Sequence, residues 1–510
     1  FTLEQLHKKT YITFWKRCLV FSGVCWLTGG IASLIGGHWI TNSIHVFGHI
    51  PWIFSLLITG AGYGLEVGLQ LFVYFAIPLL CIRKLGNWEL LLRLAYVIAI
   101  DPWYPRLIHW NYGGLTFSQF PFLEQVADII GSSGLLLYSA GLPYLLIAWW
   151  RLKSDGKNLN DNDVRYKFLK RVIAAYSFLW AVGLCYGAWR IQDINENVNM
   201  PNSDSFLNVI VIQPNFSLQD LASNPELAHS KRQGNLESLL KDSKKYLSKL
   251  SKQTDEPTLL VWPESVFPHP FFKVNEASQK VMRFAEENNT SVLFSTVDWE
   301  NNPTGRKFHG VSVLVGSNGE VLGRYNKIFL IPFGEMIPFS DIFPEAASWL
   351  RNNIANMSEF DPGQDYKVFS LSEKVRLSAP ICFDVFSPEV VRGMSLNGAN
   401  LVVNLSNLAW FGRTTASDNM VAVLRWRAIE NRVPVVFASN NGESVFIGAD
   451  GKNLSRQLGL FEEGALIARL QLQSRFSFYR KYEEWIRGGF VFIFIVLIFL
   501  AHVRGKIFQK

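Results

Sequence analysis

The stretch Ala379-Pro380-Ile381-Cys382-Phe383-Asp384 marks a change from a predicted strand over 376–382 to a predicted helix. Ser387-Pro388-Glu389 follows it and is typical of the first turn of a helix. A thiol at such a junction suits a nucleophile, because a helix N-terminus stabilises a thiolate. A buried, unreactive cysteine fits the same pattern, so position alone leaves both interpretations open.

Cysteine usage separates Cys382 from the other cysteines. The chain has five, and Cys18, Cys25, Cys81 and Cys185 lie in or beside long apolar runs. Cys382 therefore has no disulfide partner in the water-soluble part of the sequence. It is either a small core residue or a reactive thiol.

Composition indicates a membrane protein with a globular part. Of 510 residues, 49% are hydrophobic and 14% aromatic, and the net charge is +7. The basic residues flank apolar runs, which indicates membrane anchoring and no nucleic-acid partner. We predict transmembrane helices over 1–192, a catalytic domain over 205–480, and a C-terminal transmembrane helix with a basic tail over 485–510. Phe1 is not an initiator methionine, so we expect a trimmed or incomplete start.

Six apolar runs are candidate membrane spans, the weakest being Leu90–Ile100, which carries Arg93. The runs cover 19–35, 50–82, 90–100, 126–150, 172–189 and 490–501. With the N-terminus inside, Arg83 and Lys84, the 151–171 loop and the C-terminal tail also fall inside. The globular part then falls outside, in agreement with the positive-inside rule.

The globular part has the pattern of an α/β sandwich with a mixed sheet. Helical patterns at 236–250, 278–288 and 418–431 alternate with short apolar runs that are rich in β-branched residues. The predicted strands are 207–212, 258–262, 291–296, 311–315, 376–382, 401–405, 433–438, 444–447 and 465–470.

Three polar positions near predicted strand ends could form a catalytic set. Glu264 follows an apolar strand, Lys327 precedes an apolar run, and Cys382 ends the strand described above. A carboxylate can take the thiol proton, and an ammonium can stabilise an oxyanion. Each residue alone also has an ordinary structural interpretation, and spacing does not show that the three meet.

Four phrases in this order resemble the nitrilase, or carbon–nitrogen hydrolase, superfamily with its Glu-Lys-Cys triad. They are Trp262-Pro263-Glu264-Ser265, Tyr325-Asn326-Lys327, Pro332-Phe333-Gly334-Glu335 and Ile381-Cys382-Phe383-Asp384. Together with the flanking apolar runs, residues 18–503 resemble the apolipoprotein N-acyltransferase family. The resemblance implies a multi-pass helical membrane domain and an extracytoplasmic, nitrilase-like α-β-β-α sandwich.

The resemblance also implies roles for individual residues. Cys382 would carry the acyl chain as a thioester, Glu264 would be the general base, and Lys327 would stabilise the oxyanion. Glu335 would support the site as a second glutamate. Other expected site-supporting residues are Phe383, Asp384, Trp410 and Phe411.

The implied partners are a phospholipid acyl donor, a diacylated apolipoprotein acceptor and the membrane, with no cofactor and no metal. The implied location is the bacterial inner membrane, with the catalytic domain on the periplasmic side. Phe383-Asp384 replaces the family's usual Tyr-Glu, and Asn419-Met420 stands where relatives often have Gln-His. Two alternatives stay open: a membrane-anchored amidase or nitrilase with the same triad, and an inactive lipoprotein-binding relative.

Two apolar segments follow the predicted catalytic residues. One lies within 333–350, after Lys327, and the other lies within 266–272, after Glu264. We expect both to be loops that face lipid. The alternative is that they pack within the protein.

Overall fold

A computed structural model describes most of the chain. The described residues are 13–46, 48–82, 88–108, 117, 120–154, 164–197, 205–217, 225–250, 256–267, 270–273, 275–302, 305–353, 359–472 and 475–507. Arg83 and Lys84, named above for the orientation, lie outside these ranges, as do parts of the 151–171 loop and of the C-terminal tail. The described chain divides into two compact units, one formed by 1–41, 50–191 and 481–510 and the other by 42–49 and 192–480.

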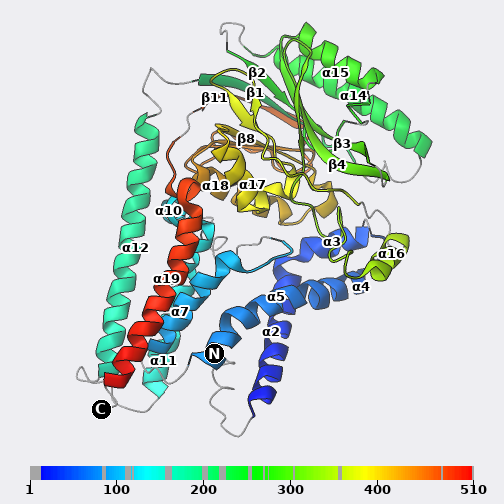
Figure 1. The fold of residues 1–510 in the computed structure, drawn as a ribbon. Coiled ribbons are helices and arrows are strands. Elements are labelled where there is room, and N and C mark those ends of the chain that lie inside the picture. Colours follow the sequence, from blue (N-terminus) through cyan, green and yellow to red (C-terminus); the bar gives the residue numbers. More distant parts are fainter. Residues whose placement is uncertain are drawn as a thin grey trace. The chain divides into compact units, whose positions relative to one another are not determined.

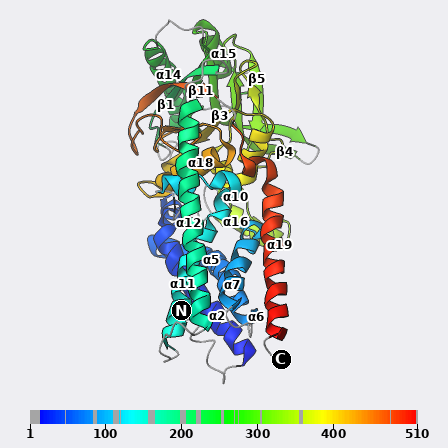
Figure 2. The same ribbon diagram turned by 90° about the vertical axis from the view of Figure 1, so that its left-hand side faces the viewer.

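The first unit is helical, and Figure 2 shows its long helices α12 and α19 with roughly parallel axes and opposite chain directions. Among the described residues, four helical runs are long and apolar enough to span a membrane: Phe14–Gly36, Trp52–Cys81, Tyr166–Glu196 and Phe478–Val503. A fifth would be the pair Ala127–Gly134 and Leu136–Trp150, which is bent by 57°. The helices are α2 (Phe14–Gly36), α4 (Trp52–Leu57), η1 (Ile58–Tyr63), α5 (Gly64–Leu71), η2 (Phe72–Ala76), α6 (Ile77–Cys81), α7 (Trp88–Ile100), η3 (Asp101–Trp103), α9 (Pro121–Glu124), α10 (Ala127–Gly134), α11 (Leu136–Ser154) and most of α12 (Val164–Asn197) and α19 (Phe478–Ile507). The helix α3 (His38–Val46) is divided between the units.

The described helix at Leu90–Ile100 is too short by itself to be a complete span. The described helix α7 has 13 residues and is followed by the short turn η3, so it rises about 20 Å. A bilayer core is about 30 Å thick. The ring of Tyr96 nevertheless lies 5.7 Å from that of Phe494 in α19, so α7 packs against a helix that is long enough to span. Within the described ranges, the four or five candidate spans are fewer than the six on which the orientation argument depends.

Glycines let α2 and α5 approach closely in the first unit. A Cβ atom built on Gly29 would lie 2.5 Å from the backbone nitrogen of Gly68, and one on Gly64 would lie 2.6 Å from the Cα of Gly30. Small residues at such contacts are typical of helix pairs in membranes, where close van der Waals packing drives association.

The second unit contains two mixed sheets. The first has the strand order β11-β1-β2-β3-β4-β5, in which β1, β2 and β3 are parallel and the other pairs are antiparallel. The second has the order β10-β9-β8-β7-β6, in which β9, β8 and β7 are parallel. The strands are β1 (Ser205–Gln213), β2 (Thr258–Val261), β3 (Ser291–Asn302), β4 (Gly305–Val315), β5 (Val321–Asn326), β6 (Phe369–Ser370), β7 (Arg376–Ser378), β8 (Leu401–Ser406), β9 (Val435–Ser439), β10 (Val445–Ile447) and β11 (Gly464–Leu472).

Helices cover both outer faces of the paired sheets (Figure 1). On one side lie α14 (Pro225–Leu247) and α15 (Glu276–Glu287), and on the other lie α17 (Pro388–Leu396) and α18 (Ala416–Asn431). The short helix α16 (Pro344–Asn353) lies outside these layers. The predicted α-β-β-α sandwich is therefore confirmed. Strands such as β8 and β9 are buried on both faces, which explains why they read as continuous apolar runs.

Some local expectations need correction. The regular strand predicted over 376–382 ends at Ser378, with only an isolated bridge from Ile381 to Leu405 beyond it. Within 266–272, Val266, Phe267 and Phe271 do not face lipid, because they are at most 3% exposed in the core between α15 and the first sheet. The segment after Lys327 is different: its exposed apolar side chains are Phe333, Phe339, Ile342, Phe343 and Trp349.

We expect Gly29→Ala to destabilise the helical unit by about 1–3 kcal/mol, because the added methyl meets backbone atoms of α5 that cannot move aside. Thermal unfolding of the detergent-solubilised protein measures the change. Gly23→Ala in the same helix is the matched control, since its Cβ meets nothing within 4 Å. Equal midpoints for the two variants would show that the glycine contact does not hold α2 against α5.

Candidate active site

Cys382 begins a tight turn that presents it next to the second sheet. It is the first residue of η4 (Cys382–Phe386), and its φ is 47°. A positive φ is uncommon for a residue with a side chain and persists only when neighbouring contacts hold it. Asn404 in β8 supplies such contacts: its Nδ2 donates to the carbonyl oxygens of Pro380 at 3.1 Å and of Cys382 at 3.2 Å.

Glu264 follows β2 and approaches the same turn. Its Oε2 accepts a hydrogen bond of 2.9 Å from the backbone N–H of Asn407, which directly follows β8. The thiol of Cys382 lies close enough to the Glu264 carboxylate for that carboxylate to raise the pKa of the thiol. The ends of one strand from each sheet thus bring the carboxylate and the thiol close together.

Lys327 directly follows β5 and lies between two carboxylates. Its Nζ is 2.7 Å from Glu335 Oε1 and 3.9 Å from Glu264 Oε1, and the side chain is fully buried. Glu335 Oε2 accepts from the backbone N–H of Ile331 at 2.9 Å. The ammonium is therefore paired with one carboxylate at hydrogen-bond distance and with the other at a longer distance.

Burial and charge set the protonation states of the site. Burial raises the pKa of Glu264 to about 7, with Lys327 opposing that rise and Glu335 adding to it. Burial and the adjacent Glu264 raise the pKa of the Cys382 thiol well above its usual value. Burial lowers the pKa of Lys327, but Glu335 and Glu264 raise it by more, so the ammonium stays charged. The site therefore holds a neutral thiol, a cation and a carboxylate that is ready to accept the thiol proton.

Asp384 ties the cysteine turn to the segment after Lys327. Its carboxylate accepts from the hydroxyl of Tyr325 at 2.7 Å, and from the backbone N–H groups of Phe329 at 2.7 Å, Ile381 at 2.9 Å and Ile328 at 3.1 Å. Burial raises the pKa of this carboxyl to about 6. Asp384 therefore holds together the segments that carry Cys382 and Lys327.

The three aromatic residues expected near the site fall into two groups. Phe383 stacks on Phe386 at 4.6 Å between ring centroids and lies 5.7 Å from Phe411, so Phe383 and Phe411 pack together. Trp410 is 37% exposed, and its carbonyl oxygen accepts from the hydroxyl of Ser43 at 2.7 Å.

The sequence analysis missed Asn404 and Asn407. Both are at most 1% exposed, and they lie in or just after the buried run Leu401–Ser406. The available signal was an asparagine within a buried apolar run and another directly after it, because buried amides need hydrogen-bond partners.

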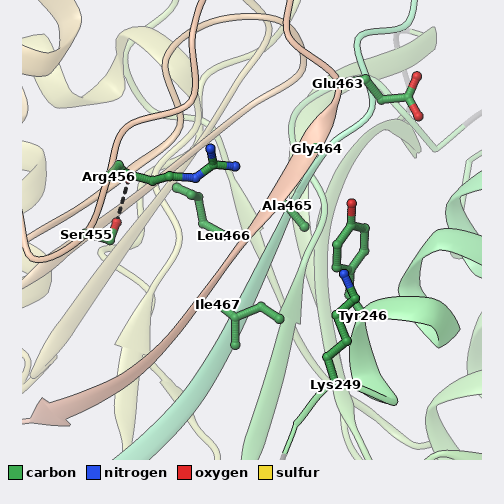
Figure 3. A pocket seen from close by; sticks show the side chains of 9 residues that line it. All are labelled: Tyr246, Lys249, Ser455, Arg456, Glu463, Gly464, Ala465, Leu466 and Ile467. Atoms are coloured by element: carbon green, nitrogen blue, oxygen red, sulfur yellow. Dashed lines mark hydrogen bonds between the residues drawn. The ribbon is translucent and has the colours of Figure 1, made fainter.

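A separate pocket of about 410 Å³ lies away from these residues (Figure 3). It lies at β11 and the end of α14, and it contains none of the predicted site residues. Its lining residues are Tyr246, Lys249, Ser455, Arg456, Glu463, Gly464, Ala465, Leu466 and Ile467.

Comparison with solved structures finds nitrilase-superfamily proteins. A protein of Saccharomyces cerevisiae from branch 10 of that superfamily is 17% identical, with a TM-score of 0.38, over 55% of this chain and 94% of its own. An amidase from Nesterenkonia is 19% identical, with a TM-score of 0.37, over 56% of this chain and 99% of its own.

Comparison with curated sequences confirms the expected resemblance. A protein of Geobacter metallireducens named apolipoprotein N-acyltransferase is 26% identical over 94% of this chain and 87% of its own length. One of the same name from Borreliella burgdorferi is 24% identical over 94% of this chain and 85% of its own. The carbon–nitrogen hydrolase family matches residues 223–478, which is half of the chain and contains Glu264, Lys327 and Cys382. The chain belongs to the carbon–nitrogen hydrolase family.

Proposed function

We propose that this protein is an acyltransferase. It would move a fatty acyl chain from a membrane phospholipid, through a thioester on Cys382, to the free α-amine of the N-terminal diacylglyceryl-cysteine of an apolipoprotein. The observation that carries the proposal is the position of the Cys382 thiol near the Glu264 carboxylate, which lies beside a buried ammonium. The relatives named apolipoprotein N-acyltransferase support the choice of acyl acceptor.

In the first half-reaction, Cys382 Sγ attacks the carbonyl carbon of a phospholipid ester while Glu264 takes the thiol proton. Lys327 stabilises the negative charge that develops on the carbonyl oxygen. The ester C–O bond then breaks, and Glu264 gives the proton to the leaving oxygen. The products are a thioester and a lysophospholipid.

In the second half-reaction, the lipoprotein amine attacks the thioester carbon. Glu264 takes a proton from the amine and returns it to the departing thiolate. The new bond is an amide, and the thiol is regenerated. The same base thus serves both halves, as two-step acyl transfer through a covalent intermediate requires.

The exposed apolar segment after Lys327 supports lipid substrates. Phe339, Ile342 and Phe343 are each at least 60% exposed, and so many large apolar side chains in one short segment are unusual at a water-exposed surface. In the proposed function, this segment contacts the acyl chains of the donor or the acceptor.

We place the catalytic unit on the periplasmic side of a bacterial inner membrane. The support is the charge pattern of one helix. Lys167, Lys170 and Arg171 lie at the start of α12, and its other end leads to β1 of the catalytic unit. If α12 spans the bilayer with its basic end inside, the catalytic unit lies outside.

The thioester is the first testable consequence. After incubation with phospholipid, intact-protein mass spectrometry should show one added acyl group on the wild-type chain and none on Cys382→Ala. Glu264→Gln should acylate at least about 100-fold more slowly, because it cannot take the thiol proton. The acyl group could be lost to water as fast as it is lost to a diacylglyceryl-cysteinyl peptide. Equal rates of this kind would favour an amidase-like hydrolase. A chain that never acylates would contradict the proposal.

The pH dependence follows from the raised pKa of Glu264. Acylation of Cys382 should fall about tenfold per pH unit below about 7, because the protonated carboxyl cannot accept the thiol proton. Glu335→Gln removes a negative charge that raises this pKa, so the fall should begin at a lower pH. Single-turnover acylation rates between pH 5 and pH 9 measure both profiles. Identical profiles would exclude Glu264 as the titrating base.

The lipid-facing role of the apolar segment makes a third prediction. Phe339→Ser combined with Phe343→Ser should lower kcat/KM for phospholipid in vesicles about tenfold, because apolar contact area is lost. Alkylation of Cys382 by iodoacetamide should not change. Leu454→Ser, at another exposed apolar position of the same unit, is the control. If the double variant is as active as this control, the segment has no role in lipid binding.

A further inference from the structure

The side chain of Asn407 leaves one hydrogen-bond donor without an acceptor next to the candidate site. Its Oδ1 accepts from the backbone N–H of Ala409 at 3.2 Å and from Asn440 Nδ2 at 3.3 Å. These two donors fix which way the amide faces, because turning it over would lose both bonds. Within the part of the chain that the structure describes, Nδ2 has no partner, although the residue is only 1% exposed. A buried donor without an acceptor is destabilising, so its presence calls for an explanation.

The position of this donor is tied to the general base. The backbone N–H of Asn407 donates to Glu264 Oε2 at 2.9 Å, and Lys327 Nζ lies 3.9 Å from the other oxygen, Oε1. The unused donor Nδ2 therefore belongs to the same residue whose backbone N–H binds the general base.

We propose that Asn407 Nδ2 donates a hydrogen bond to the leaving ester oxygen of the phospholipid during acylation of Cys382. This inference rests on the proposed function. In that step the C–S bond forms, the ester C–O bond breaks, and the thiol proton passes through Glu264 to the leaving oxygen. Negative charge develops on this oxygen before the proton arrives. A preformed donor at that position stabilises the charge, while Lys327 serves the carbonyl oxygen.

The donor suits the first half-reaction and not the second. An attacking amine points its lone pair at the thioester carbon, and its N–H groups need an acceptor, which Glu264 provides. Asn407 Nδ2 can only donate, so it has no partner on that amine. Asn407 thus acts as a catalytic residue that is selective for an oxygen leaving group.

The test separates the two half-reactions of the full-length protein in detergent or vesicles. Acylation of Cys382 by phosphatidylethanolamine is followed by intact-protein mass spectrometry. The acyl-enzyme is then mixed with a synthetic diacylglyceryl-cysteinyl peptide, and loss of the acyl group is timed. We expect Asn407→Ala to slow acylation about 10- to 100-fold and to change deacylation less than about threefold.

Two further variants keep the test interpretable. Asn407→Asp keeps the Oδ1 acceptor that bonds Ala409 but lacks the amide donor, so it should show the same selective loss even if Asn407→Ala does not fold. Its added charge next to Glu264 affects both half-reactions, so the ratio of the two rates is compared. Asn400→Ala is the matched control: Asn400 precedes β8 as Asn407 follows it, and its amide is paired with the backbone of Arg376 and Lys374. It should leave both rates unchanged.

Several results would overturn the inference. An equal loss in both half-reactions, accompanied by slower alkylation of Cys382 by iodoacetamide, would mean that Asn407 only positions Glu264. Unchanged rates with a lower unfolding midpoint would mean that the donor has only a structural role. A wild-type chain that is not acylated at all would refute the proposed function itself, whereas acylation that is equal in wild type and Asn407→Ala would refute only the role of Asn407.

Discussion

The buried ammonium of Lys327 is the interaction on which the candidate site depends. A charge removed from water is strongly destabilising unless it is paired, and removal of one partner from a buried pair costs about 3–5 kcal/mol. Glu335 lies 2.7 Å from this ammonium and Glu264 3.9 Å from it. Removal of both carboxylates would therefore leave the buried ammonium of Lys327 unpaired. The same pairing holds Glu264 next to Cys382, so the stability of the site and its chemistry come from one set of contacts.

The backbone around this cation is strained and is held by hydrogen bonds. Ser265, Phe333 and Cys382 have φ values of 62°, 63° and 47°, so each segment that carries a site residue includes a sparsely populated conformation. Asp384 accepts four hydrogen bonds from the segments around Lys327 and Cys382. It is one methylene shorter than the glutamate expected from the family resemblance, yet it reaches all four donors. The shorter side chain therefore still joins the two segments through hydrogen bonds.

The sequence predicts the layers of the catalytic unit well, because buried parallel strands such as β8 and β9 are continuous apolar runs. It misses β5, whose residues Val321 and Leu322 are exposed and whose pattern lacks the apolar signal of the central strands. It also misplaces the segment 266–272, since aromatic residues after a strand look the same whether they face lipid or fill a core. The resemblance predicted which side chains to examine. Only the fold shows that strand ends from both sheets bring Glu264 and Cys382 together.

Asn407 shows why part of a site stays hidden in sequence. An asparagine after a strand has the pattern of a turn or cap residue, and here Oδ1 does cap the backbone N–H of Ala409. What sets the residue apart is the remaining half of its amide, which no local pattern can reveal. Cys382 is neutral at rest because its pKa is raised, so reaction in the proposed mechanism requires proton transfer to Glu264 and stabilisation of both ester oxygens as charge develops on them. In such a site, an ammonium would stabilise the carbonyl oxygen and an amide the leaving oxygen, which would lower the barrier to acylation by an oxygen ester. The site would then need no reactive thiolate in the absence of substrate.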